Sequence, residues 1–162
     1  MKQTYRVLAG LIALGVLVQA AAVAFGWFSA LSEIDNGAVI AGDYDYNTGQ
    51  IIHSIGGLMV IPLLAVILLI VSFFTRTVVP GAVKWAGIVF GVTLLQVALA
   101  FAAFSAPILG ALHGINALVL LGTAGRAAAM TRETRASGTG PTAGAVPSQR
   151  TGTSSTGSDL PV

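Results

Sequence analysis

The sequence predicts an all-α protein: a four-transmembrane-helix up-down bundle made of two tandem helical hairpins, with a disordered C-terminal tail. Three observations lead to this prediction: an apolar composition, uncharged runs long enough to cross a bilayer, and a change of composition near residue 131. Of the 162 residues, 55% are hydrophobic and only 9% are charged, whereas soluble domains carry about 25% charged residues. The expected parts are a membrane domain at 1–130 and a cytoplasmic tail at 131–162.

Uncharged stretches define the expected spans. Residues 7–32 and, apart from His53, residues 47–75 are long enough, because roughly 20 residues cross about 30 Å of hydrocarbon. The stretch 85–125 is too long for one span, and Pro107 marks its break, since proline fits the first turn of a helix and disrupts an interior. Asn47 and Gln50 have the spacing of a capping box, so the second helix should start at Thr48. The predicted spans are about 7–30, 48–74, 83–105 and 107–129.

The charged residues give the expected orientation. All eight lysines and arginines fall on one side of these spans, and the first loop on the other side carries four acids, Glu33, Asp35, Asp43 and Asp45. By the positive-inside rule, both termini are cytoplasmic and the protein lies in the plasma (inner) membrane. Lys2, Arg6 and the following apolar residues could also be a signal peptide, but the apolar run continues to Ala30, which favours a retained span.

Several classes of function are not expected. The chain has no cysteine, which excludes disulfides, thiolate ligands and thiol catalysis. It shows no basic face with interleaved aromatics, so nucleic acid is not an expected partner. No nucleophile and base pair, phosphate loop or paired carboxylates suggest an enzyme. The Gly-, Ser-, Thr- and Pro-rich tail reads most simply as a solubilising extension, with a tether or docking segment as the alternative.

An internal duplication brings the most informative residues together. Spans one and three share a pattern around Gln19 and Gln96, and spans two and four share His-x-Ile-x-small-Leu, starting at His53 and His113. Tandem hairpins can be related by an axis along the membrane normal, which places span two opposite span four. His53 and His113 begin at similar depths in their helices, about 8 to 9 Å below the surface at 1.5 Å per residue. Both histidines should therefore point across a common centre.

Two opposed histidines predict a metal-centred cofactor. Diagonal helices of a square bundle lie about 11 to 14 Å apart, and two histidine arms holding one metal span about 12 Å. His53 and His113 are thus candidate axial ligands of one haem b, as in bis-histidine haem bundles. Small or polar residues near the same level would make room for the ring: Ala22 and Gly26 in span one, Gly56 and Gly57 in span two, Ala100 and Ala103 in span three, and Asn116 in span four.

Other interpretations of these residues stay open. Small residues on membrane helices commonly serve close packing, and a buried histidine can be an interhelical hydrogen bonder. Quinone binding, proton transfer or another metal are further possibilities. Gln19 and Gln96 are expected deeper than the histidines, as interhelical hydrogen bonders, with orientation of an imidazole as the less favoured role.

The glutamines in spans one and three and the histidines in spans two and four, including the segment LHGINALVLL, resemble a family of small bacterial four-span membrane proteins of unknown function, over about residues 7–125. The histidine placement is similar to one half of heme A synthase, which implies that His53 and His113 are axial haem ligands. Gln50 and Ser54 stand where that enzyme has glutamate and arginine, and its cysteine pair is absent. The resemblance thus implies a bundle with haem b and not oxygenase chemistry.

The leading hypothesis is an integral membrane protein that binds one b-type haem for electron transfer or haem handling, with a redox partner or a larger membrane complex. The alternative is a cofactor-free accessory or assembly subunit of such a complex; a small transporter is a third class. One difficulty is that outward haem propionates would meet the acidic loop. Hydrogen bonds would have to come from four residues near it, Tyr44, Tyr46, Asn47 and Gln50.

Overall fold

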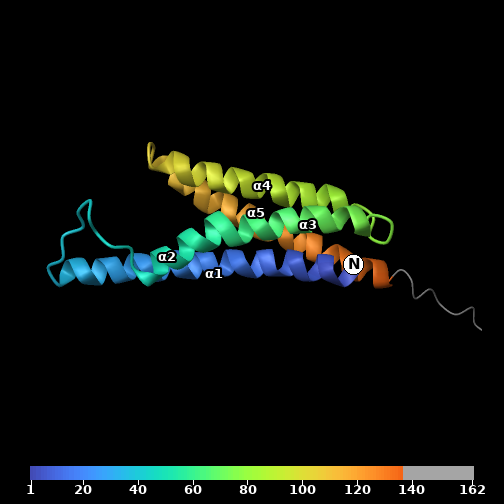
Figure 1. The fold of residues 1–162 in the computed structure, drawn as a ribbon, viewed down its shortest axis with the longest axis horizontal. Coiled ribbons are helices and arrows are strands. Elements are labelled where there is room, and N and C mark those ends of the chain that lie inside the picture. Colours follow the sequence, from blue (N-terminus) through green and yellow to red (C-terminus); the bar gives the residue numbers. More distant parts are fainter. Residues whose placement is uncertain (137–162) are drawn as a thin grey trace, which may run out of the picture.

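The computed structural model describes residues 1–136 and is built from four long helical spans (Figure 1). The first is α1, Lys2–Asp35. The second comprises α2, Thr48–Ile55, a π-helical turn η1, Gly56–Val60, and α3, Ile61–Thr75. The third and fourth are α4, Ala82–Ala103, and α5, Ile108–Ala136. All four spans are long and apolar enough to cross a membrane, and no strand occurs in the described part, so the predicted fold class is confirmed.

The ends of the helices follow the local sequence signals. The break in the long third uncharged stretch is confirmed, since α4 ends at Ala103 and α5 begins at Ile108, directly after Pro107. At the other end of α5 the helix continues to Ala136, past the boundary expected at residue 130. The remainder of the expected tail, 137–162, lies outside the described residues.

The spans form a four-membered ring in cross-section. α1 packs against α3 and α5, and α4 packs against the same two helices. The first hairpin is therefore α1 with α2 and α3, the second is α4 with α5, and α1 lies diagonally opposite α4. This leaves the second and fourth spans, which carry the histidines, as the other diagonal pair.

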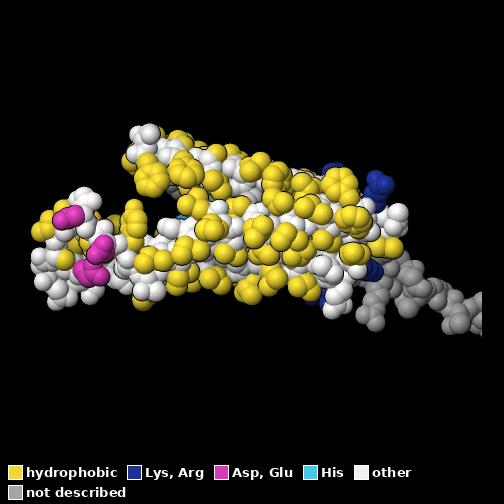
Figure 2. Space-filling view, in the orientation of Figure 1, with side chains coloured by type: hydrophobic (Ala, Val, Ile, Leu, Met, Phe, Trp, Pro, Cys, Tyr) yellow, Lys and Arg dark blue, Asp and Glu magenta, His cyan; other side chains and the backbone are white. Residues whose placement is uncertain are grey.

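The core lies in the half of the bundle nearest the basic residues. Apart from Tyr5, its fully buried residues are small or medium-sized, such as Ala9, Ile12, Leu68 and Val89, so the helices approach closely there. Toward the opposite end the helices spread apart (Figure 1). The outer surfaces are apolar along the spans, with lysine and arginine at one end and aspartate and glutamate at the other (Figure 2). This charge separation matches the sequence pattern and leaves the apolar faces to lipid.

A capping box begins α2, as the sequence predicts. The Asn47 side chain accepts from the backbone N–H of Gln50 at 3.1 Å, and the Gln50 side chain accepts from the backbone N–H of Asn47 at 3.0 Å. The amide of Asn47 also donates to the backbone oxygen of Gly26 at 2.8 Å. Asn47 therefore both caps α2 and fastens it to α1.

Replacing Asn47 with alanine should destabilise the protein by about 1–2 kcal/mol, because N-cap removal typically costs about 1 kcal/mol and the bond to α1 is lost as well. The measurement is thermal or denaturant unfolding in detergent. Asn36→Ala is the matched control: Asn36 donates only to Ser32 one turn back and is exposed, so its loss should cost much less. Equal destabilisation by both variants would contradict this account of α2.

The π-helical turn was not anticipated from the sequence. At this turn the backbone N–H of Ile61 bonds to the oxygen of Gly56, five residues back. Pro62 follows it in the first turn of α3. Proline has no N–H to donate and its ring crowds the carbonyl four residues earlier, so the helix widens by one residue just before it. The turn rotates α2 relative to α3, and His53 lies on the α2 side.

The acidic end carries one described side-chain pair. The hydroxyl of Tyr44 donates to Glu33 at 2.6 Å and joins the loop to the end of α1. This hydrogen bond to a carboxylate raises the pKa of Tyr44 above its ordinary value of 10.0, because the bond is lost when the phenol ionises.

The Tyr44 phenol should therefore ionise at higher pH in the wild type than in a Glu33→Gln variant, as followed by ultraviolet absorbance. Because the pKa is raised in the folded state, any stabilisation from the pair is present below pH 10.0 and is lost as the pH rises through the raised pKa. Tyr44→Phe identifies the absorbance change that belongs to this residue. A titration that Glu33→Gln leaves unmoved would show that the contact does not persist in solution.

Candidate functional site

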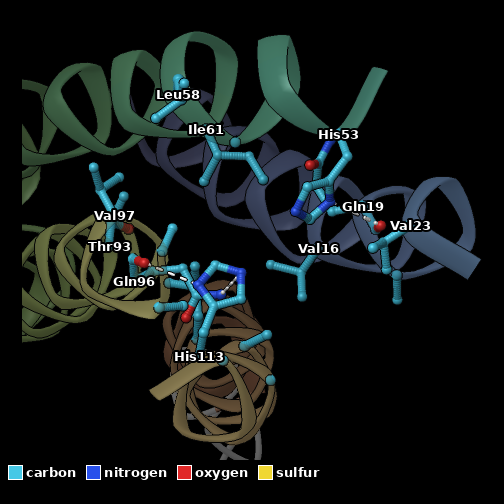
Figure 3. A pocket seen from close by; sticks show the side chains of 18 of the residues that line it. Val16, Gln19, Val23, His53, Leu58, Ile61, Thr93, Gln96, Val97 and His113 are labelled. Carbon is cyan, nitrogen blue, oxygen red and sulfur yellow. Dashed lines mark hydrogen bonds between the residues drawn. The ribbon is translucent and has the colours of Figure 1, made fainter. Parts of the chain in front are cut away.

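The two histidines meet across the bundle, between α2 and α5. The ring centroids of His53 and His113 are 6.2 Å apart, and the ring planes are inclined at 71°. Figure 3 shows both rings pointing into a cavity from opposite walls. The tandem arrangement therefore brings together the two residues that the duplication singled out.

Each imidazole is held by the neighbouring span of its own hairpin. Nδ1 of His53 lies 3.3 Å from the backbone oxygen of Gln19 in α1, and Nδ1 of His113 lies 3.0 Å from that of Gln96 in α4. A carbonyl oxygen can only accept, so in both rings Nδ1 carries the hydrogen and donates it. The Nε2 lone pair of each ring is then available to another group. The same contact recurs in both halves, as expected of a structural duplication.

In the second hairpin the glutamine side chain also contacts the histidine. The amide of Gln96 donates to Nε2 of His113 at 3.1 Å, and its oxygen accepts from the amide of Asn116 at 2.7 Å. Asn116 donates as well to the backbone oxygen of Val92 at 3.1 Å. Gln96 was expected deeper than His113, with orientation of an imidazole as its less favoured role, but in the structure both its side chain and its backbone oxygen contact the His113 ring.

In the first hairpin the polar side chains of the site have fewer hydrogen-bond partners than in the second. The amide of Gln19 donates to the backbone oxygen of Ile52 at 3.3 Å, while its side-chain oxygen is buried without a hydrogen-bond partner. The same amide fills the space beside Gly56, where a Cβ would overlap it. Among the described residues, Nε2 of His53 has no hydrogen-bond partner, whereas both ring nitrogens of His113 are bonded to Gln96.

The cavity between the histidines has a volume of about 560 Å³, within the usual range of ligand sites. Figure 2 shows the surface hollowed between α4 and the first hairpin, with histidine visible at its floor. Besides the histidines and glutamines, the lining is mainly apolar and includes Val16, Ala20, Val23, Leu58, Ile61, Val97, Phe101, Phe104, Ala117 and Leu121. An apolar molecule with one or two groups for the imidazoles would suit such a space.

The small residues expected around a cofactor divide into two groups. Gly57, Ala100 and Ala103 line the cavity. Four others do not: Ala22 and Gly26 pack closely against Gly49 of α2, Gly56 against Gln19, and Asn116 bonds to Gln96. For Ala22 and Gly26 this position supports the packing interpretation. On α1 the cavity is lined instead by Val16, Ala20 and Val23.

Some lining residues were not identified from the sequence. The wall also includes Thr93 and Phe101 on α4, Phe104 directly after α4, and Gly110 and Gly114 on α5. The available signal was their closeness to Gln96 and His113, from which they are one to eight residues away in the sequence. This closeness in sequence places the residues on or next to α4 and α5, but only the packing of the two helices decides which face of each one lines the cavity.

Two histidines alone cannot complete the coordination of a bare metal ion. Among the described residues no group of three or more His, Cys, Asp or Glu side chains is placed to hold one, and protein zinc sites use three or four such ligands. The chain matches no known protein-family profile, no curated protein and no solved structure. The geometry of the site therefore carries the functional argument.

Proposed function

We propose that this integral membrane protein binds one b-type haem between His53 and His113. The separation of the rings carries the proposal. Two imidazoles that hold one metal between them in a straight line, each at about 2.0 Å, have ring centroids about 6 Å apart, and the separation of these two centroids is 6.2 Å. The porphyrin would supply the four ligands that the protein does not, and it brings one-electron redox chemistry when bound.

The hydrogen bonds at Nδ1 support this assignment. Histidine ligands commonly donate their second N–H to a backbone carbonyl, which fixes the ring orientation and makes the ligating nitrogen more basic. Gln19 and Gln96 provide those carbonyl oxygens. The amide of Gln96 would have to leave Nε2 of His113 when that atom binds a metal, and Asn116 would still hold its side-chain oxygen.

Short side chains at four positions of the cavity wall support a flat ring between the histidines: Ala100 and Ala103 on α4, Gly57 at the π-helical turn and Ala20 on α1. With both termini in the cytoplasm, as the basic end indicates, the site would lie in the outer part of the bilayer. Electron transfer or haem handling, with a redox partner or larger complex, is the role we assign.

The acidic end limits how the ring can be oriented. The described residues there include Glu33, Asp35, Asp43 and Asp45 but no lysine or arginine. Tyr44 is bonded to Glu33, and Asn47 and Gln50 are bonded to each other. The haem propionates would therefore be hydrated at the mouth of the cavity and not paired with a cation.

A second function has its own supporting observation. The network of Gln96, His113 and Asn116 satisfies the second imidazole without any ligand, as expected of an interhelical polar contact in a membrane. On this alternative the protein is a cofactor-free accessory or assembly subunit of a larger membrane complex.

The optical spectrum of the full chain, purified in detergent from haem-sufficient cells, tests the proposal. A Soret band with α and β bands on reduction, and a pyridine haemochrome of the b type, are the expected results. A protein that stays colourless after incubation with haemin would overturn the haem proposal. A stoichiometric membrane partner purified with that colourless protein would support the accessory function.

A further inference from the structure

A second cavity lies at the opposite end of the bundle from the histidines. It has a volume of about 380 Å³ and is lined by Lys2, Gln3 and Arg6 from α1 and by Thr131 and Arg132 from α5. It does not share a residue with the histidine cavity. An inference about it is therefore independent of the proposed function.

Three basic side chains line this cleft, and no acidic side chain is among its lining residues. Among residues 1–132, whose side chains the structure describes, Lys2, Arg6 and Arg132 form no ion pair, and the four acids of that range, between Glu33 and Asp45, lie at the far end of the bundle. Clustering like charges is unfavourable unless an anion is present. Lys2 and Arg6 are also four residues apart on one helix, so they share a face.

The position of the cleft along the helices indicates which class of anion would bind there. It lies where the apolar parts of α1 and α5 end, at the level of the phospholipid headgroups. The first backbone N–H groups of α1, beginning at Lys2, add partial positive charge there. Arginine binds phosphate oxygens with paired N–H groups, and basic pockets between membrane helices on the cytoplasmic side suit anionic headgroups.

We propose that this cleft is a binding site for the phosphate of an anionic phospholipid headgroup, held between α1 and α5. Arg6 and Arg132 contribute the paired donors, Lys2 adds a point charge, and Gln3 supplies an amide. Bound there, the headgroup links the first span to the last one.

The test compares two double variants of equal charge. Arg6→Gln/Arg132→Gln, the cleft variant, removes two charges from the cleft. Arg76→Gln/Lys84→Gln, the loop variant, removes one charge directly after α3 and one in the first turn of α4, at the same end of the bundle but outside the cleft. The full chain is titrated with phosphatidylglycerol or phosphatidylcholine in detergent, and the bound lipid is counted by native mass spectrometry. Inorganic phosphate alone is a separate probe.

We expect the wild type to retain phosphatidylglycerol over phosphatidylcholine, and the cleft variant to bind phosphatidylglycerol at least about tenfold more weakly, since each basic group near a membrane surface contributes substantially to anionic lipid binding. The loop variant should stay close to the wild type. Equal losses in both variants, or no headgroup preference in the wild type, would overturn the proposal. Binding of inorganic phosphate with the same dependence on the cleft would assign it to a soluble phosphate and overturn the lipid assignment.

Discussion

If the protein binds haem as proposed, replacing His113 with alanine is expected to abolish the low-spin haem spectrum. The imidazoles face one another at 6.2 Å, and a low-spin bis-histidine iron needs both. His53→Ala should have the same effect, because no other described residue in the cavity offers a comparable ligand. Either variant should lose nearly all of the reduced α and β bands, with any residual absorbance in a high-spin or unligated form.

Adding free imidazole to the two histidine variants distinguishes the loss of a metal ligand from the loss of the folded structure. Alanine leaves space where the ring stood, and free imidazole can occupy it and ligate the metal, so the low-spin bands should return in both histidine variants. Ser54→Ala is the control, since Ser54 lines the same cavity beside His53 and has no ligand role. An unchanged spectrum in both histidine variants would reject the haem assignment.

Replacing Gly49 with alanine is expected to give the largest loss of stability. A Cβ at Gly49 would lie 2.6 Å from both the backbone oxygen of Ala22 and the Cα of Gly26, and closer still to the Gly26 nitrogen. These are backbone atoms of α1, which cannot turn aside as a flexible side chain would. Forced separation of α1 and α2 should cost about 3 kcal/mol, the upper part of the range for overpacked cores.

The Gly49→Ala effect can be measured by thermal unfolding in detergent. Gly91→Ala is the matched control: Gly91 lies within α4, and a Cβ there meets nothing within 4 Å. Alanine at such a helical position should be neutral or stabilise the protein by up to about 1 kcal/mol. If the proposed cofactor site is correct, Gly49→Ala should also weaken haem retention, because Gly49 is one turn before His53. Equal stability of the two variants would contradict the close crossing of α1 and α2.

Much of the fold could be predicted from the sequence because strong local signals mark it. Uncharged runs longer than a bilayer define the spans, Pro107 marks the break before α5, and Asn47 with Gln50 marks the start of α2. The meeting of His53 and His113 followed from the duplication, since tandem hairpins place the second and fourth spans on a diagonal.

The cavity lining and the hydrogen-bond partners of the glutamines could not be predicted, because they depend on how each helix is rotated about its axis. An apolar sequence does not indicate that rotation clearly. Successive residues on a helix point about 100° apart, so an error in rotation of about one residue step exchanges Ala22 and Gly26 for Ala20 and Val23 at the cavity wall. The spans are apolar on nearly every face, which leaves no polar stripe to set that rotation. The amide of Gln96 could reach several partners, and only the packing of α4 on α5 selects His113.

The hydroxyl of Tyr5 donates to the backbone oxygen of Ala82 at 3.1 Å, and both residues are fully buried. This bond ties the first turn of α1 to the first turn of α4, two helices that are diagonal to each other along the rest of their length. The two hairpins are therefore fastened to each other at the basic end and diverge toward the acidic end (Figure 1). The histidine cavity lies on the diverging side of this fastening, in the half of the bundle that faces the acidic loop.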